Sequence, residues 1–457
     1  MNIQFVDREM EFGILNAFLM KQRGIFVLWG RRRVGKSRLL TEFAKEKESV
    51  YLLATKETEK AILRNFSEEL GRHYNDPALQ GASFDSFRDM LRYLDKRRQN
   101  KPFLLILDEF PYLCDANKSI PSVLQAEWDQ HHLGDMHIIL SGSTVSSMES
   151  EVLAVKSPLY GRRAGQYKLQ PLGPIEAKGF FPLMGWEDYF RLYTVVGGTP
   201  EYLLRMDPKK TLRDNIVKNI AAPGSMLLDE PELLLKTEVR EPRTYFSLMK
   251  ALSHGRATPN EIATWVGIPR TSVLGYMEML EKLDLVHRRL PITESDNSRR
   301  GRYRIKDNFF RFYFRFIFPN LQQIRQGLNT GLVDSLDRDF NSFMGQSFET
   351  VVESTLIAMA RADQFRFTQL GPWWDGKDEI DLVALNGHEV TFVECKWSDL
   401  DAREGARILS DLKEKAKKVK FGGPGRKERF IIAAKSAEPV PGARILTVAD
   451  IAGFAER

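Results

Sequence analysis

The sequence contains little cysteine and no long apolar run. Its two cysteines, Cys114 and Cys395, lie far apart without a Cys-x-x-Cys spacing, and no His-rich or Cys-rich pattern suggests zinc. The chain has no uninterrupted apolar stretch long enough for a membrane span. Its first residues lack a basic segment followed by an apolar core, so we expect no secretion signal. These absences predict a cytoplasmic protein with reduced thiols and no membrane partner.

The chain is long enough for several domains. Its 457 residues exceed what one hydrophobic core usually supports, so we expect about two to four domains. Hydrophobic residues make up 43% and charged residues 28% of the chain, as in ordinary globular proteins. A net charge of +6 is compatible with nucleic acid as a partner, but so small an excess does not decide the question.

A phosphate-binding pattern follows the first strand-like run, residues 24–29. The next eight residues fit G-x-x-x-x-G-K-[ST], in which two glycines allow a tight turn with N–H groups facing the phosphates. The lysine would neutralise phosphate charge, and the serine would ligate Mg²⁺. We therefore predict a site for ATP or GTP with Mg²⁺. Its residues are Gly30, Arg31, Arg32, Arg33, Val34, Gly35, Lys36, Ser37 and Arg38.

A second apolar run, residues 103–107, ends in two carboxylates. Asp108 and Glu109 stand where a buried strand would emerge beside the phosphate-binding loop, which is the Walker B arrangement. Asp108 would share the Mg²⁺ shell with Ser37, and Glu109 would orient or deprotonate the attacking water. The alternative is a buried strand followed by a polar helix start.

Two later segments are candidates for assisting hydrolysis. The third strand-like run ends in hydroxyls, and Ser141 or Ser143 would position the lytic water as a sensor, although a simple turn would look the same. Beyond it, Arg162 and Arg163 follow a glycine turn, and one of them would act as an arginine finger on its own γ-phosphate or on that of a neighbouring subunit. A solvated basic turn is the alternative. A finger acting in trans would imply a homo-oligomer.

These motifs, in this order, resemble the archaeal-type ATPases, a STAND-like branch of the AAA+ class. Residues 5–11 resemble that family's Phe-x-x-Arg-Glu-x-Glu box, which lies against the nucleotide and gives Arg8 a cofactor-binding role. Taken alone, Arg8 and Glu9 would also fit an ordinary ion pair at a helix start. Residues 197–200 resemble the family's GxP lid motif, which implies a place for Pro200 beside the nucleotide.

The pattern of residues in the middle of the chain predicts short helices. Residues 242–290 fit a helix-turn-helix unit in which Gly267 separates the last two helices, and the strand-like segment that follows would form a wing. A DNA-bound winged helix would lead its recognition helix with Arg270, Thr271 and Ser272. A winged helix that only packs against the ATPase is the equal alternative.

A basic segment and an aromatic segment come next. Residues 298–306 hold five basic side chains in nine positions and are a candidate for phosphate contacts. Residues 307–318 are rich in aromatics. Such interleaving occurs in proteins that stack single strands, but the helix-compatible spacing favours a buried helix that joins two domains.

The C-terminal region contains two acids and a lysine on a predicted hairpin. Asn386 and Gly387 form a turn signal between two apolar runs. Glu394 and Lys396 are two apart on the second strand and therefore project from the same face, and Asp381 begins the first strand. Such groups can bind Mg²⁺ or Mn²⁺ and activate water against a phosphodiester.

This constellation resembles the PD-(D/E)xK nuclease superfamily. The resemblance implies that Asp381 and Glu394 are metal ligands, that Lys396 supports the nucleophile and that Glu349 is the acid on the preceding helix. The chain departs from the pattern before the aspartate, where residues 379–380 are Glu-Ile in place of Pro-Asp. A degenerate domain that keeps the shape without cleavage is the alternative.

We therefore expect an α/β protein with a P-loop AAA+-type ATPase core, a helical lid, a winged helix and a C-terminal restriction-endonuclease-like domain of the DUF234 type. The expected domains are 1–170 for the core, 171–240 for the lid, 241–298 for the winged helix, 299–335 for a basic strand and aromatic helix linker, and 336–457 for the nuclease-like domain. The function we expect is ATP hydrolysis coupled to a metal-dependent DNA nuclease. The alternative is an ATP-controlled DNA-binding or signalling switch with an inactive tail.

Overall fold

A computed structural model of the protein describes residues 5–21, 23–98, 101–423 and 425–456. The chain divides into two compact units, Met1–Pro171 and Leu172–Arg457. Among the described residues, no helix is both long and apolar enough to cross a membrane.

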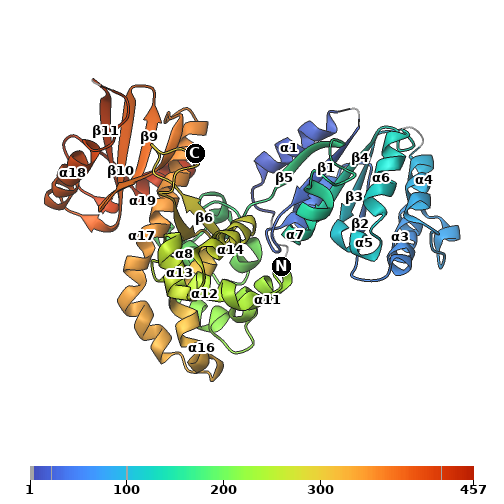
Figure 1. Ribbon diagram of the computed structural model, residues 1–457, viewed down its shortest axis with the longest axis horizontal. Helices are drawn as coiled ribbons and strands as arrows, with labels where there is room; N and C mark the ends of the chain where they lie inside the picture. The colour runs from blue at the N-terminus through green and yellow to red at the C-terminus, as the bar shows by residue number, and fades with distance from the viewer. Residues whose placement is uncertain (1–4, 22, 99–100, 424, 457) are drawn as a thin grey trace. The chain divides into compact units, whose positions relative to one another are not determined.

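The first unit is built on a five-stranded sheet in which every pairing is parallel (Figure 1). The strand order is β2-β3-β4-β1-β5. The three inner strands are almost entirely buried because both of their faces are covered, and this explains their continuous apolar sequences. The strands are β1 Gly24–Trp29, β2 Ser49–Leu53, β3 Phe103–Asp108, β4 Met136–Gly142 and β5 Arg163–Lys168.

Helices cover both faces of this sheet. On one face α1 and α2 pack through Leu15, Leu39 and Phe43. On the other face the core includes Phe66 from α3 and Leu94 from α4. The helices are α1 Glu9–Leu19, α2 Lys36–Ala44, α3 Glu59–Tyr74, α4 Phe87–Arg97, α5 Phe110–Ala116, α6 Ile120–Asp129 and α7 Val145–Met148, with short 3₁₀ or π segments at Pro77–Leu79 and Glu149–Leu153. The expected α/β class is confirmed for this unit.

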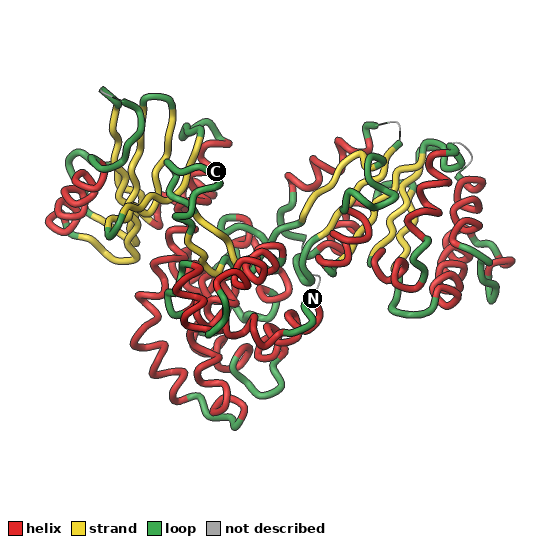
Figure 2. Tube along the Cα trace, viewed as in Figure 1, coloured by secondary structure: helices red, strands yellow, loops and turns green. Residues whose placement is uncertain are grey.

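The second unit begins with a helical region (Figure 2). Its helices are α8 Trp186–Val196, α9 Pro200–Leu203, α10 Leu212–Asn215, α11 Met226–Glu238, α12 Pro242–Ser253, α13 Pro259–Val266, α14 Arg270–Lys282, α15 Asn308–Phe312, α16 Phe318–Arg325 and α17 Thr330–Arg361, with 3₁₀ or π segments at Glu176–Phe180, Ile216–Ile220 and Tyr313–Ile317. Gly267 adopts a positive φ of 78° and ends α13, so the predicted turn before α14 is present. The aromatic side chains of residues 309–317 are buried, so the interpretation as a buried helical segment is confirmed.

A two-stranded antiparallel hairpin follows α14. It pairs β6, Val286–Arg289, with β7, Arg302–Ile305. The predicted boundary at 298/299 therefore separates two strands that pair with each other. Similarly, α17 runs without interruption through the predicted boundary at 335/336. The segment from 343 that the sequence indicated as helical is the second half of this 32-residue helix.

The second unit ends in a five-stranded mixed sheet of order β12-β11-β10-β9-β8. Pairings β8–β9 and β9–β10 are antiparallel, whereas β10–β11 and β11–β12 are parallel. The elements are β8 Gln369–Asp375, β9 Asp378–Asn386, β10 Glu389–Leu400, α18 Ala402–Ala416, β11 Lys427–Ala437, β12 Arg444–Thr447 and α19 Val448–Ala455. Asn386 pairs with Glu389 across the turn, so the predicted hairpin is confirmed.

Candidate functional site

The phosphate-binding loop connects the carboxyl end of β1 to the start of α2. Gly30 has a φ of 145°, and a Cβ placed there would lie 2.6 Å from the carbonyl oxygen of Leu169. Gly35 has a φ of 95° and caps the N-terminus of α2. Both positions therefore require glycine. The loop ends at the N-terminus of α2, where free backbone N–H groups and the positive end of the helix dipole favour a bound phosphate.

Lys36, Ser37 and Asp108 lie close together at this loop. The ammonium of Lys36 donates to the carbonyl oxygens of Gly30, at 2.7 Å, and Arg31, at 3.0 Å. The hydroxyl of Ser37 donates to Asp108 Oδ2 at 2.7 Å. A hydroxyl and a carboxylate are the oxygen donors that Mg²⁺ takes beside a nucleotide phosphate, so the residues present fit the expected ion.

Tyr51 is a member of this site that sequence reasoning missed. It lies on β2, and its hydroxyl donates to the same carboxyl oxygen of Asp108 that Ser37 contacts. Burial and the negative charge of Asp108 raise the pKa of the Tyr51 hydroxyl, so Tyr51 stays a neutral donor. The available signal was a polar hydroxyl in a strand that neighbours the Asp108 strand, but the strand order is not readable from sequence.

Arg8 lies against the phosphate-binding loop. Its guanidinium donates to the carbonyl oxygen of Val34 at 2.9 Å and to that of Gln170 at 3.0 Å. It also pairs with Glu11 at 2.8 Å, so the helix-start ion pair exists but with a different acid from the expected Glu9. The structure thus brings the N-terminal box to the loop, while contact between Arg8 and nucleotide stays a prediction.

The other predicted side chains of the phosphate-binding loop and the start of α2 lie in different environments. Val34 is fully buried in the core beside α2, and Arg31 is 2% exposed. Arg32 donates to the Tyr112 hydroxyl at 2.8 Å. Arg33 has a φ of 71°, and Arg38 extends along α2 toward Glu42 at 4.0 Å. Their predicted contribution to nucleotide binding would therefore come from backbone N–H groups more than from these side chains.

Glu109 and the two candidate sensor serines meet at the ends of β3 and β4. Glu109 has a φ of 51° and accepts a hydrogen bond from the backbone N–H of Ser143 at 3.2 Å. Continuing the parallel register of β3 and β4 brings Asp108 beside Ser141. The Ser141 hydroxyl is buried and finds no hydrogen-bond partner within the described part of the chain. The base and sensor roles stay predictions, with geometry that permits both.

Arg162 and Arg163 lie at the other end of the sheet. Arg163 is paired with Ile25 at the start of β1, and the phosphate-binding loop follows the far end of that strand, roughly 16 Å away at the rise of an extended strand. Arg162 forms a bidentate ion pair with Asp129 at 2.8 Å. This geometry does not bring either arginine to the phosphate loop of its own unit, so the expectation of a finger in cis is not met. A role in trans stays a prediction.

The GxP-like segment belongs to the second unit. Gly197 has a φ of 64°, and a Cβ on Gly198 would lie 1.7 Å from the carbonyl oxygen of Leu172. Pro200 begins α9, where its missing N–H costs nothing. The segment is a tight turn held against the start of its own unit, and the role of Pro200 beside nucleotide stays a prediction.

The C-terminal acids and lysine converge on the β9–β10 hairpin. Leu382 pairs with Val393, and continuing this antiparallel register brings Asp381 opposite Glu394. The backbone N–H of Cys395 donates to Asp381 Oδ2 at 2.7 Å. Lys396 Nζ lies 2.9 Å from Glu394 Oε1. The three side chains that the sequence proposed are therefore neighbours.

The acids of this hairpin repel one another. Burial, together with the negative charges of Glu394 and Glu349, raises the pKa of the Asp381 carboxyl to about 7. Burial also raises the pKa of Glu349, which Arg304 partly offsets. For Lys396 burial lowers the pKa, but the attraction of Glu394 outweighs it and the net shift is upward. Asp381 therefore holds its proton more tightly than an exposed aspartate, because it is shielded from solvent and lies near two other acids.

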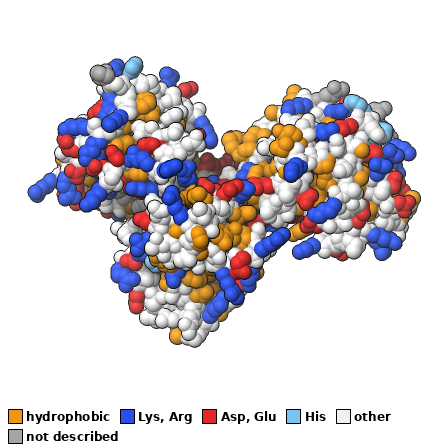
Figure 3. All heavy atoms as spheres, in the orientation of Figure 1, with side chains coloured by type: hydrophobic (Ala, Val, Ile, Leu, Met, Phe, Trp, Pro, Cys, Tyr) orange, Lys and Arg blue, Asp and Glu red, His pale blue; other side chains and the backbone are white. Residues whose placement is uncertain are grey.

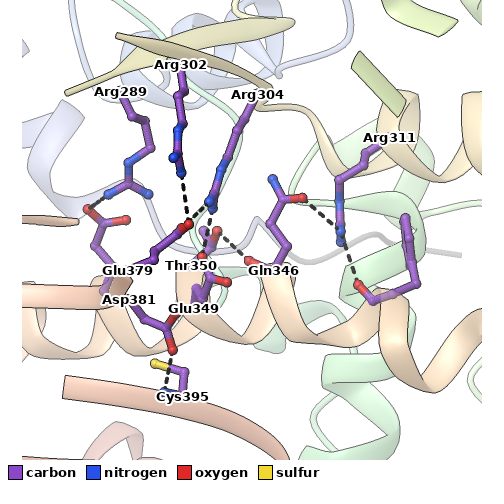
Figure 4. Close-up of polar contacts among 12 residues, drawn as sticks. Arg289, Arg302, Arg304, Arg311, Gln346, Glu349, Thr350, Glu379, Asp381 and Cys395 are labelled. Atoms are coloured by element: carbon purple, nitrogen blue, oxygen red, sulfur yellow. Dashed lines mark hydrogen bonds and ion pairs between the residues drawn. The ribbon is translucent and has the colours of Figure 1, made fainter. Parts of the chain in front are cut away.

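Arginines of the β6–β7 hairpin reach this site (Figure 4). Arg304 pairs with Glu349 on α17 at 3.0 Å and with Glu379 on β9 at 2.6 Å. Arg302 pairs with Glu379 at 2.9 Å. The basic segment proposed for phosphate contacts is therefore engaged with acids. In the described ranges, no group of three or more His, Cys, Asp or Glu side chains is arranged to hold a metal ion.

The predicted recognition positions of the winged helix are accessible. Arg270, Thr271 and Ser272 begin α14 and are exposed. On the face that Figure 3 shows, basic and acidic side chains are interspersed over the C-terminal domain. Whether this region binds DNA stays a prediction.

Comparison with known proteins supports this geometry. Residues 5–206 match a family described as an ATPase domain predominantly from Archaea. Residues 313–408 match DUF234, described as archaeal and bacterial proteins of unknown function. The chain is 35% identical over 421 residues to an uncharacterized protein of Methanocaldococcus jannaschii, an alignment that covers 91% of this chain and 92% of that protein.

The fold also resembles a solved structure, the Walker-type ATPase of Pyrococcus abyssi. The TM-score is 0.52 at 21% identity, and the match covers 68% of this chain and 96% of that one. At this identity the likeness concerns the fold. Together with the family matches and the geometry of the phosphate loop, it shows that the chain belongs to the archaeal-type P-loop ATPases and consists of such an ATPase domain followed by a C-terminal DUF234 domain.

Proposed function

We propose that this ATPase couples its nucleotide state to metal-dependent cleavage of DNA at the C-terminal hairpin. The observation that carries the proposal is the arrangement of Asp381 and Glu394 on neighbouring strands, with Lys396 beside Glu394 at 2.9 Å. A buried acid, Glu394, and a half-buried acid, Asp381, on neighbouring strands are costly unless a cation compensates them. The raised pKa of Asp381, which burial and then the charges of Glu394 and Glu349 cause, is consistent with this cost.

The donor set suits a hard divalent cation. Asp381 and Glu394 would hold Mg²⁺ or Mn²⁺ through carboxylate oxygens, with Glu349 close enough to contribute to the local charge. When bound, such an ion lowers the pKa of water and stabilises charge on a phosphodiester oxygen. Lys396 keeps its ammonium at the edge of the acids, where it would orient a phosphate oxygen or the attacking water.

DNA is the substrate class that the helix preceding this site favours. Arg270, Thr271 and Ser272 lie exposed at the start of α14, the position at which recognition helices enter a major groove. The β6–β7 hairpin would act as the wing of this winged helix. Its Arg288 contacts backbone carbonyl oxygens at Asp296 and Ser298.

A second candidate function is a switch that binds DNA without cutting it. It is favoured by the ion pairs that already engage the acids: Glu349 with Arg304 at 3.0 Å, and Glu394 with Lys415 at 3.5 Å. In this account the C-terminal domain is a platform whose charges satisfy one another. ATP binding and hydrolysis would then change assembly or DNA affinity alone.

A cleavage assay separates the two functions. Purified full-length protein is incubated with linear, supercoiled and single-stranded DNA, with ATP, and with Mg²⁺, Mn²⁺ or a chelator. The nuclease account predicts metal-dependent cleavage that Lys396→Ala abolishes, while ATP turnover is unchanged. Lys417→Ala is the matched control, because Lys417 is an exposed lysine paired with Glu414 on the surface.

The failure of cleavage has a definite meaning in this assay. If wild-type protein hydrolyses ATP but leaves every DNA form intact with either metal, the nuclease account is wrong. If such protein still binds DNA in a nucleotide-dependent way, the switch account is supported.

A further inference from the structure

A cavity of about 610 Å³ lies in the second unit between the winged-helix region and α17. Its volume is within the range of small-molecule sites in proteins. The side chains that matter for its chemistry are Arg302, Arg304, Arg311, Arg315, Gln346 and Glu349. The acidic side chains of the lining are Glu349 and Glu261. Four arginines against two glutamates give the lining an excess of positive charge.

Arg311 is the unusual member of this lining. It is 6% exposed, and its guanidinium contacts neutral groups: the carbonyl oxygen of Phe343 at 3.1 Å, the amide oxygen of Gln346 at 3.5 Å and the hydroxyl of Ser347 (Figure 4). Its Nε is buried and finds no hydrogen-bond partner among the described residues. A buried guanidinium without a carboxylate is costly, so the fold keeps an anion-binding group here at the expense of stability.

The other arginines differ because acids already engage them. Arg302 and Arg304 pair with Glu379, and Arg315 pairs with Asp339 at 3.2 Å. These pairs fix the positions of the guanidinium groups around the cavity without neutralising Arg311. Within the described residues no carboxylate contacts Arg311 directly, although Glu349 in the same lining attracts it, and the other three arginines are held in place by their own acids.

A smaller cavity that shares lining residues with the larger one also has more basic than acidic side chains in its lining. It measures about 260 Å³ and shares Arg304, Arg311, Gln346 and Glu349 with the larger one. His287 lines it, and burial together with the charges of Arg289, Lys306 and Arg304 lowers the pKa of His287 to about 3. Burial also lowers the pKa of Arg311 to about 9; the attraction of Glu349 opposes this shift, and the charge of Arg304 adds to it.

We propose that the larger cavity binds a small phosphate-bearing molecule through Arg311. A guanidinium offers forked donors that match phosphate oxygens, and Arg315 would approach from the more exposed side. Because Arg311 is only 6% exposed, a phosphate carried on a small molecule reaches it more readily than the backbone of a nucleic acid. The volume accommodates a mononucleotide or a sugar phosphate.

Ligand binding here would also act on Arg304. A phosphate in the cavity would compete with Glu349 for the Arg304 guanidinium, which lines the same wall. The cavity is thus a second phosphate site, separate from the P-loop, and its existence does not depend on whether the C-terminal domain cleaves DNA.

Calorimetric titration with inorganic phosphate and with AMP tests the proposal. The full chain carries Lys36→Ala throughout, so that the P-loop does not contribute phosphate binding. We expect one binding event, weakened at least about tenfold by adding Arg311→Gln, since a charge-assisted hydrogen bond is lost. Arg315→Gln should weaken it by a smaller factor, and Arg325→Gln, outside the cavity and paired with Asp229, should leave it unchanged.

The outcomes are separable even if Arg311→Gln does not fold. In that case Arg315→Gln decides, because Arg315 is 38% exposed and its loss leaves the core intact. The proposal is overturned if neither phosphate nor AMP binds the Lys36→Ala chain, or if folded Arg311→Gln and Arg315→Gln bind both as well as their parent. It is also overturned if an oligonucleotide without a terminal phosphate binds through Arg311 while inorganic phosphate does not. That result would assign the cavity to the nucleic-acid backbone.

Discussion

The P-loop and the C-terminal hairpin both gather acids and a lysine, but they hold their charges differently. Lys36 is fixed by carbonyl oxygens of its own loop, and Asp108 is contacted by the hydroxyls of Ser37 and Tyr51. Beside the β9–β10 hairpin, Glu349 of α17 accepts a hydrogen bond from Arg304 of the β6–β7 hairpin. Both sites thus join residues far apart in sequence, but the first holds its charged groups with neutral partners, whereas the second holds them with ion pairs.

Because of this difference, the loss of a side chain should have different consequences at the two sites. Loss of a side chain from the P-loop removes chemistry but leaves the backbone that shapes the loop. Loss of an arginine from the β6–β7 hairpin leaves an acid beside the β9–β10 hairpin without its cation and therefore lowers stability. Substitutions at the two sites should therefore differ in whether they lower activity or stability.

Lys36→Ala should lower ATP turnover at least about a hundredfold, because a preorganised positive donor to the phosphates is lost. The unfolding free energy should change little, since the loop glycines and the Ser37 contact remain. A steady-state phosphate-release assay measures the effect. Lys45→Ala is the control, because Lys45 is an exposed lysine that pairs with Glu42 beyond the end of α2. Wild-type turnover in Lys36→Ala would refute the assignment of the nucleotide site.

Arg304→Gln should destabilise the second unit by about 2 kcal/mol, because Glu349 and Glu379 both lose their shared cation. The cost is below that of a fully buried pair, since solvent reaches these side chains. Urea denaturation followed by circular dichroism measures it. Arg338→Gln, which removes an exposed arginine beside Asp339, should cost almost nothing. Equal stability of the two variants would contradict the account of the hairpin charges.

Much of the P-loop region was predictable because its determinants are contiguous. The spacing of Gly30, Gly35 and Lys36 is a local requirement of one turn, and Asp108 follows a strand whose burial is evident from its composition. The Asn386 turn and the buried aromatic segment were equally local. Tyr51 was missed because its contact with Asp108 depends on the order of the strands.

The hairpin region was predictable only in part. Its acids and lysine could be named, but the ion pairs from Arg302 and Arg304 depend on packing between elements far apart in sequence. The predicted boundary at 335/336 falls inside α17 because the neighbours of this helix change along its length. Phe343 contacts Phe316 of the helical region, whereas Phe348 contacts Trp397 of the sheet, so no single apolar stripe marks the whole helix.

The pH dependence of stability should differ between wild type and Asp381→Asn. The folded-state pKa of Asp381, about 7, lies above its ordinary value of 3.8, so the folded chain binds more protons than the unfolded chain between these values. The wild type is therefore favoured at low pH and loses that stability as pH rises through about 7.

Asp381→Asn cannot ionise and should become relatively more stable across this window, by roughly 1–2 kcal/mol after allowance for solvent access. Denaturation midpoints of both proteins below and above the window measure the difference. A difference that is independent of pH would show that Asp381 does not titrate as the hairpin electrostatics require.

Ser141→Ala should have the smallest effect on stability. Its hydroxyl is buried and finds no hydrogen-bond partner among the residues that the structure describes, so its removal should raise the unfolding free energy by at most about 1 kcal/mol. If Ser141 is the sensor, ATP turnover falls although stability does not. Unchanged turnover in Ser141→Ala would leave Ser143, which contacts Glu109, as the candidate.

Calorimetric Mn²⁺ titration tests the proposal that the C-terminal hairpin holds a divalent cation. The full chain carries Lys36→Ala and is free of nucleotide, so that the P-loop contributes little. The account predicts one Mn²⁺ site whose affinity rises with pH through about 7, as Asp381 loses its proton, and which Asp381→Ala abolishes. Absence of Mn²⁺ binding to this chain, or binding that Asp381→Ala leaves unchanged, would contradict it.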